Sequence, residues 1–125
     1  EVGLWRHLCN YVGLCLFVPW SNEQITQAVE AITGWPTSSR KLMKTAERGI
    51  TLARIFNLRE GFTSRDDTLP RRFATSPADS NLKGVGVDPE KLSAAQKVYY
   101  QMMGWDENGV PTPKKLADLG LANLN

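Results

Sequence analysis

The chain has 125 residues, with 15 Lys and Arg against 13 Asp and Glu, and its apolar and charged fractions are typical of a globular protein large enough to bury a core. Its two cysteines exclude a disulfide framework. The longest uncharged stretch, residues 8–22, is shorter than the roughly 18 residues of a membrane span, and no basic segment precedes it as in a signal peptide. We therefore predict a cytoplasmic protein without a membrane segment.

The N-terminal residues predict a helix followed by an unusual turn. The start is apolar and lacks Met, which suggests a piece of a longer chain, although a trimmed tag would look the same. Trp5, Leu8, Cys9 and Val12 have the spacing of one helix face, and Gly13 marks its end. Residues 14–20 are apolar without helical spacing, so we expect buried, irregular backbone or a short turn. Buried loops are uncommon because their peptide groups need partners, which favours a functional role here.

Two further helices should follow. Ser21 and Gln24 form a capping-box pattern that opens a helix ending at Gly34, and a longer helix is predicted for residues 38–58. Each has an apolar stripe that should be buried. The stripes consist of Ile25, Ala28, Val29 and Ile32 in the first helix and Leu42, Met43, Ala46, Ile50, Ala53 and Phe56 in the second. The basic residues Lys41, Lys44, Arg48 and Arg54 should lie mostly on the remaining surface.

The second half should contain a long irregular segment and two C-terminal helices. Residues 59–88, which include Pro70, Pro77 and several glycines, show no clear period and should wrap the helices or reach a neighbouring domain. Asp88-Pro89 begins a helix with Leu92, Ala95, Val98, Tyr99 and Met102 at helical spacing, and Gly104 ends it. Residues 106–109 form a tight turn, and Thr112-Pro113 begins a short helix through Leu119.

These elements predict an all-α fold, because no segment alternates as a strand does. We expect one irregular, multi-helical domain over residues 1–125. Its parts are residues 1–20, a helical pair at 21–58, the irregular segment 59–88 and the C-terminal helices at 89–125.

Cys15 is the candidate for chemistry that the residues themselves single out. Its spacing from Cys9 does not match the C-x-x-C pattern of zinc and redox sites, and each cysteine read alone is a buried structural thiol. Yet Cys15 lies between Gly13 and Pro19 on an apolar, non-helical stretch, which also suits a constrained thiolate ligand. One cysteine cannot hold a cluster by itself, so the residues alone favour an inert core thiol over a ligand at Cys15.

Other polar residues offer weaker candidates. Asp66 and Asp67 could bind a metal or form an acid/base pair, but neighbouring arginines also favour an ion-paired turn. His7 should flank the core and has no evident partners. Residues 36–75 carry nine basic against four acidic residues, so this region either meets an acidic partner or forms a solvated helix face. Stacking motifs for nucleic acid are missing.

Several segments in order resemble the tungsten-containing aldehyde ferredoxin oxidoreductases. Asn10-Tyr-Val-Gly-Leu-Cys-Leu-Phe17 is similar to their D-x-x-G-L-C-x-F motif, and Ile32-Thr-Gly-Trp35 contains their T-G-W element. Further similar segments are Phe56-Asn-Leu-Arg-Glu-Gly-Phe62, Asp66-Asp-Thr-Leu-Pro-Arg-Arg-Phe73, Gly104-Trp-Asp-Glu-Asn-Gly-Val-Pro-Thr112 and Leu119-Gly-Leu121. The resemblance spans nearly the whole chain.

The resemblance implies that this is the C-terminal domain of such an enzyme. The family oxidises small aldehydes to carboxylic acids, and electrons pass from a tungsten (or molybdenum) bis-pterin cofactor through a [4Fe–4S] cluster to ferredoxin. Cys15 then corresponds to the fourth cluster ligand, and Asn10, Leu14 and Leu16 to pterin-site positions. Asn10 replaces the family's Asp, which keeps a carbonyl acceptor and removes a charge.

The catalytic residues and the other cluster cysteines would lie in upstream domains of the same polypeptide, so the chain alone should be inactive. The rival hypothesis is a non-enzymatic helical module that binds an acidic partner through residues 40–72. A complete gene close to this length would favour the module.

Overall fold

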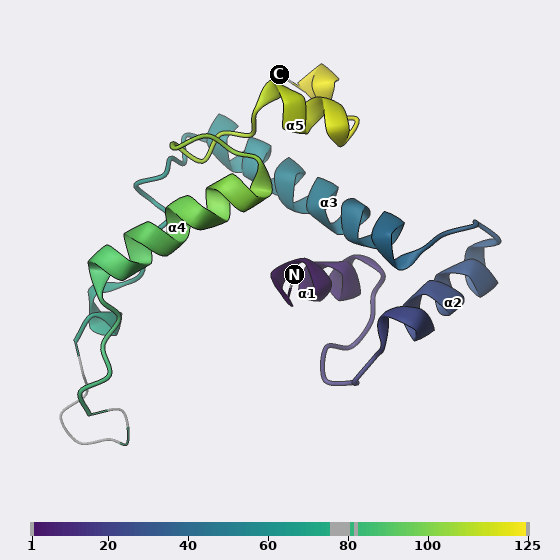
Figure 1. Ribbon diagram of the computed structural model, residues 1–125, viewed down its shortest axis with the longest axis horizontal. Coiled ribbons are helices and arrows are strands. Elements are labelled where there is room, and N and C mark those ends of the chain that lie inside the picture. Colours follow the sequence, from purple (N-terminus) through teal and green to yellow (C-terminus); the bar gives the residue numbers. More distant parts are fainter. Residues whose placement is uncertain (1, 76–80, 82, 125) are drawn as a thin grey trace. The chain divides into compact units, whose positions relative to one another are not determined.

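The computed structural model describes residues 2–75, 81 and 83–124 and confirms the all-α prediction (Figure 1). Its helices are α1 (Val2–Tyr11), α2 (Asn22–Thr33), α3 (Ser39–Arg59), α4 (Pro89–Met103) and α5 (Pro113–Asp118). Two short 3₁₀ helices span Arg71–Phe73 and Ala122–Leu124. The described residues contain no strand, only an isolated bridge between Trp105 and Pro111.

The helix ends follow the local signals. The Ser21 hydroxyl accepts from the Gln24 N–H at 3.1 Å, and the Gln24 amide oxygen accepts from the Ser21 N–H at 2.9 Å, which completes the predicted capping box. The Asp88 carboxylate caps α4 by accepting from the N–H groups of Glu90 and Lys91. Because these bonds join residues two or three positions apart, the sequence predicted the helix starts well.

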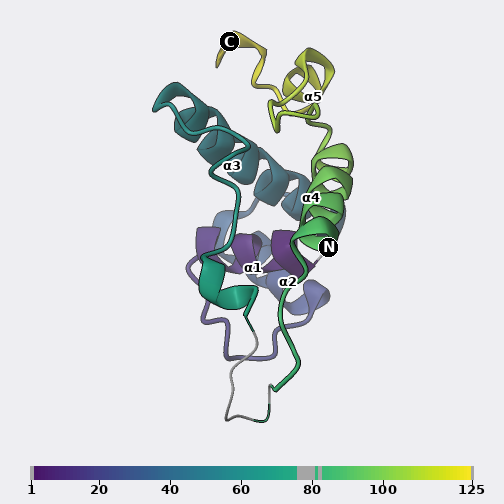
Figure 2. The same ribbon diagram turned by 90° about the vertical axis from the view of Figure 1, so that its left-hand side faces the viewer.

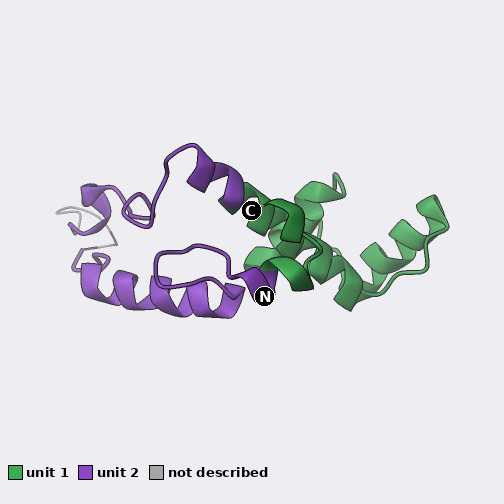
Figure 3. Ribbon diagram, turned by 90° about the horizontal axis from the view of Figure 1, so that it is seen from above, with its two compact units in different colours: residues 1–54, 116–125 green, residues 55–115 purple. Residues whose placement is uncertain are grey.

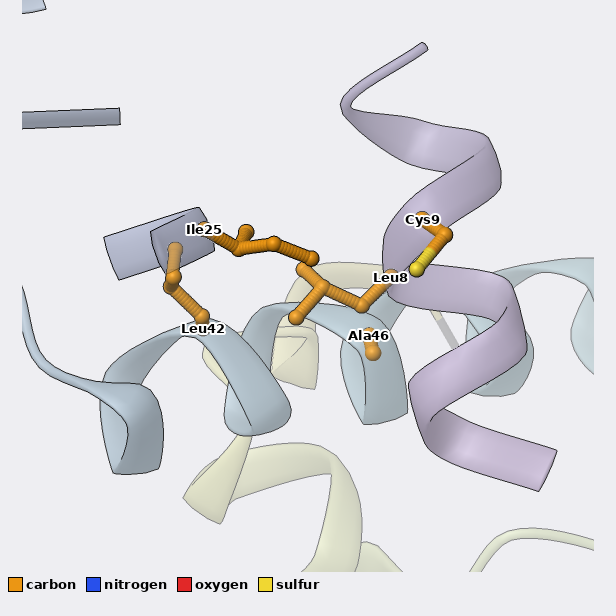
Figure 4. Packing of buried hydrophobic residues seen from close by; sticks show 5 residues of the cluster. All are labelled: Leu8, Cys9, Ile25, Leu42 and Ala46. Atoms are coloured by element: carbon orange, nitrogen blue, oxygen red, sulfur yellow. The ribbon is translucent and has the colours of Figure 1, made fainter. Parts of the chain in front are cut away.

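The chain divides into two compact units, drawn in different colours in Figure 3. Unit 1 comprises residues 1–54 and 116–125, and unit 2 comprises residues 55–115. In unit 1, helices α1, α2 and α3 bury a cluster of five residues between them, namely Leu8, Cys9, Ile25, Leu42 and Ala46 (Figure 4). This cluster holds α1 in place and thereby positions the segment that follows it.

Unit 2 has a smaller aromatic core at the end of α4. The Trp105 ring lies 5.8 Å from that of Tyr99, edge to face, and 5.9 Å from that of Tyr100. The Tyr100 hydroxyl donates to the Asp67 carboxylate and accepts from the Gln96 amide at 2.7 Å. Asp67 thus ties the irregular segment to α4.

Helix faces were predicted less well than helix ends. Ile32, Ala53 and Phe56 are exposed, although the apolar stripes of α2 and α3 predicted their burial. On α4, Val98, Tyr99 and Met102, which the sequence identified by helical spacing alone, are exposed, and the buried residues are Tyr100 and Met103. Arg54, predicted on the surface, is only 7% exposed, so that part of the prediction was wrong. Apolar periodicity identifies the face of a helix and does not identify what covers it.

The irregular segment contains turns and the 3₁₀ helix at Arg71–Phe73. Asp66 closes one turn, since its carboxylate accepts from the N–H of Thr63 at 2.7 Å and from the Thr63 hydroxyl at 3.1 Å. Pro77, which contributed to the prediction of irregular structure, lies outside the described residues. Whether residues 1–125 act as one domain stays a prediction.

Candidate functional site

The end of α1 explains the Gly13-Leu14-Cys15 sequence. The Gly13 N–H donates to the Asn10 carbonyl at 3.2 Å, and the Leu14 N–H donates to the Cys9 carbonyl at 2.8 Å. This pair of bonds is a Schellman motif, which requires a residue in the left-handed conformation. Gly13 occupies that position with a φ of 74°. The motif reverses the chain direction one residue before Cys15.

Leu14 anchors this turn. Its side chain is half-buried and packs against the Leu8–Cys9 cluster, which provides the hydrophobic contact that accompanies a Schellman motif. Trp20, at the other end of the segment, also packs on the cluster. The segment between these two anchors runs away from α1 and α2 as a loop, which both Figure 1 and Figure 2 show.

Cys15 itself is exposed, whereas Cys9 is 2% exposed in the core. The prediction of a buried thiol was therefore correct for Cys9 and wrong for Cys15. The reason lies in the turn: the Val18 N–H donates to the Cys15 carbonyl at 3.3 Å, and this turn directs Leu16, Phe17 and Val18 outward. The Phe17 side chain is 98% exposed.

The four sequence-predicted site residues thus lie on one short stretch with different surroundings. Asn10 is exposed on the last turn of α1, Leu16 and Cys15 are exposed on the loop, and Leu14 points into the cluster. The Leu14 N–H donates to the Cys9 carbonyl, so Leu14 contributes to the site mainly by holding Cys15 in position.

Among the four predicted site residues, Cys15 can supply one ligand to an iron–sulfur cluster. Cys15 offers an accessible, soft sulfur donor, which suits iron. In the part of the chain that the structure describes, no three His, Cys, Asp or Glu side chains gather as a metal site. The remaining ligands of a cluster would therefore come from outside the described residues.

The other sequence candidates lie elsewhere. His7 is exposed on α1, as expected, with its ring centroid 6.0 Å from that of Tyr11. Asp66 and Asp67 serve as hydrogen-bond acceptors in unit 2. None of the helices in the described ranges combines the length and the apolar content needed to cross a bilayer.

Comparison with known proteins decides the family. Residues 2–121 match the family profile described as aldehyde ferredoxin oxidoreductase, domains 2 and 3. The chain belongs to the aldehyde ferredoxin oxidoreductase family. This membership confirms the resemblance of the sequence motifs and makes the chain part of an oxidoreductase family.

Two relatives have similar sequence identity to this chain and are named for different substrates. The chain is 34% identical over 121 residues, 94% of its length, to a tungsten-containing aldehyde ferredoxin oxidoreductase of Pyrococcus furiosus. It is 31% identical over 120 residues, 91% of its length, to the WOR-like subunit of an aliphatic sulfonate oxidoreductase of the same species. The chain spans about a fifth of both relatives, 20% of the first and 18% of the second.

A solved structure shows the same fold. The active-site complex BamBC of benzoyl coenzyme A reductase, with bound 1,5-dienoyl-CoA, matches 94% of the chain and 18% of its own chain. The TM-score is 0.76 at 27% sequence identity. The same helical arrangement therefore occurs in a protein named for a different reaction.

Proposed function

We propose that this chain is the C-terminal part of a tungsten-dependent, aldehyde ferredoxin oxidoreductase-like enzyme and that Cys15 provides one thiolate ligand of a [4Fe–4S] cluster. The observation that carries the proposal is the contrast between the two cysteines. Cys9 is sealed in the core, while Cys15 is presented on an anchored turn with an exposed apolar surface. An exposed cysteine among exposed apolar residues suits a ligand that a further domain covers.

When bound, a tungsten or molybdenum bis-pterin centre would supply two-electron redox chemistry next to a cluster that passes electrons on singly. The net reaction turns an aldehyde and water into a carboxylate, three protons and two electrons. Two one-electron ferredoxin centres would accept those electrons. We favour an aldehyde because four relatives are named for aldehydes and one is named for aliphatic sulfonates.

The residues of this chain would bind the cluster and the pterin and would exclude water from them. The Cys15 thiolate would bind iron, and Leu16, Phe17 and Val18 would shield that sulfur from water, since burial and hydrogen bonds to sulfur tune a cluster's potential. The Asn10 amide oxygen can accept from a pterin amino group. Leu14 holds the turn through its packing on the core. The catalytic groups would come from upstream domains, so the chain alone should be inactive.

The two cysteines offer a matched test in the complete enzyme. Cys15→Ala should lower the iron content and abolish the cluster's electron paramagnetic resonance signal while the fold is retained. Cys9→Ala removes a thiol of the same type from the core, so it should lower stability and leave the iron content unchanged. Equal iron content and signal in both variants would refute Cys15 as a ligand.

A second measurement tests the reaction itself. The complete enzyme should reduce a viologen dye when given a short-chain aldehyde and should release the carboxylate in a ratio of one carboxylate per two dye molecules. If an aliphatic sulfonate supports dye reduction and the aldehyde does not, the proposed substrate class is wrong.

A further inference from the structure

Helix α3 carries two hollows side by side in unit 1 that the proposed cluster chemistry does not use. The first, the apolar hollow, has a volume of about 520 Å³ and is lined by Val12, Val29, Ile32, Trp35 and Leu42. The second, the basic hollow, has a volume of about 320 Å³ and is lined by Lys41, Lys44, Arg48, Asp118 and Leu119. Lys41 and Thr45 line both, so the two hollows adjoin.

The two hollows differ in chemistry. Ile32 and Trp35 at the apolar hollow are 84% and 71% exposed, which is a large apolar surface to leave in water. The basic hollow has three cationic side chains against the single carboxylate of Asp118. An apolar centre beside a charged margin, with Trp and Arg present, is the composition of a protein–protein interface.

The apolar hollow also lies close along the chain to the proposed cluster ligand. Val12 lines it and belongs to the Schellman motif that ends α1, three residues before Cys15. Both hollows and Cys15 belong to unit 1, so their arrangement does not depend on how the two units are placed. A partner that occupies the apolar hollow would therefore sit beside the turn that presents Cys15.

We propose that the two hollows together form the docking surface for an acidic, ferredoxin-type electron carrier, an inference that rests on the proposed function. The carrier's acidic margin would face Lys41, Lys44 and Arg48, and an apolar patch near its cluster would cover Ile32 and Trp35. Each docking event transfers one electron to the carrier's oxidised cluster, and two such events remove the two electrons that oxidation of one substrate releases. No bond is formed or broken between the proteins.

Charge complementarity favours this occupant over two others. A small anion would fill the basic hollow and leave Trp35 and Ile32 exposed. An upstream domain packed permanently on this surface would bury Lys44 and Arg48, and buried charges are costly unless each is paired. A transient acidic partner uses both hollows, since its charges speed the encounter and the apolar contact holds it briefly.

A charge-reversal pair in the complete enzyme tests the surface. Lys44→Glu/Arg48→Glu should raise the Kd for the oxidised ferredoxin of the same organism about tenfold at low salt, measured by biolayer interferometry, and should flatten the dependence of binding on salt. The control is Lys97→Glu/Lys114→Glu, which makes the same charge change at exposed residues of unit 2 that line neither hollow. It should change the Kd less than twofold.

Two further readouts separate the contributions. Trp35→Ala should weaken binding about tenfold and leave the salt dependence unchanged, because it removes apolar contact and no charge. In steady state, the ratio of ferredoxin-linked to viologen-linked turnover should fall in the Lys44→Glu/Arg48→Glu enzyme and stay constant in the control.

The inference is wrong if both charge-reversal pairs weaken binding equally, because net charge alone would then be responsible. It is also wrong if the hollow variants lower the melting temperature without altering the Kd, which would show that another domain covers the surface, or if the unmodified enzyme does not bind ferredoxin. Failure of the proposed function is seen separately, as a cluster that survives Cys15→Ala or as absent viologen-linked aldehyde oxidation.

Discussion

Gly49 in the middle of α3 is the position where helix propensity and packing predict opposite effects. Replacing glycine by alanine inside a helix stabilises it by about 0.5–1 kcal/mol if nothing else changes. However, a Cβ atom at Gly49 would lie 2.6 Å from Cζ and 2.7 Å from Oη of Tyr11, the last residue of α1. Carbon atoms in contact prefer about 3.5–4.0 Å, so the Tyr11 ring would have to move by about an ångström or more.

The cost of that movement can be estimated from the exposure of Tyr11, which is 48%. A buried aromatic side chain covers about 150–250 Å², so roughly 100 Å² of the Tyr11 surface is removed from water. At about 25 cal/mol per Å², displacing the ring from this contact removes up to about 2.5 kcal/mol of hydrophobic stabilisation. After the gain in helix propensity, Gly49→Ala should destabilise the chain by about 1–2 kcal/mol.

Urea unfolding followed by circular dichroism at 222 nm measures this difference. Gly3→Ala in α1 is the control, because no atom lies within 4 Å of its added Cβ, and it should leave stability unchanged or slightly raised. The decisive measurement repeats Gly49→Ala in a Tyr11→Ala background, where the clash is gone and the substitution should become stabilising by about 0.5–1 kcal/mol. If Gly49→Ala has the same sign in both backgrounds, the packing argument is refuted.

Three further substitutions test other contacts by the same unfolding assay. Gly13→Ala places a Cβ in open space at a φ of 74°, so it should cost about 1–2 kcal/mol from backbone strain alone, and Gly13→Asn should cost less. Leu8→Ala empties the centre of the unit 1 cluster and should cost about 3–5 kcal/mol, whereas Leu8→Met should cost less than about 1.5 kcal/mol. Tyr100→Phe removes the donor to Asp67 and the acceptor for Gln96 and should cost about 1–3 kcal/mol; no loss would show that these bonds do not stabilise unit 2.

Helix boundaries could be predicted because the signals are local. Ser21, Asp88 and the glycines at 13, 34 and 104 act through hydrogen bonds that span at most five positions, and α3 was predicted to within one residue at each end. Burial could not be predicted equally well, because it depends on residues far away in the sequence. Arg54 and Ile32 show this in opposite directions, since the arginine is buried and the isoleucine is exposed.

The candidate site shows the same division. The family motifs identified the Cys15 segment as the site, and the family membership is confirmed, while the roles of Cys15, Asn10, Leu14 and Leu16 stay predictions. Composition and spacing predicted a buried Cys15 because the surrounding stretch is apolar. They contain no information on the direction in which a turn points the Cys15 side chain. The two hollows on α3 were not predicted as such. The basic excess of residues 36–75 was a sequence signal for the basic hollow alone.

The order of residues 13 to 15 now has a physical explanation that any proposed role must respect. Glycine is needed first because the chain reverses through a left-handed conformation. Leucine is needed second because the Schellman motif brings that side chain back onto Cys9 and the core. The third residue is then the first that is free to point outward, and a thiol placed there is presented to whatever packs on unit 1. Moving the cysteine one position earlier would place it at the half-buried position of Leu14, which packs on the core, so the turn sets where along the chain a side chain is first presented outward.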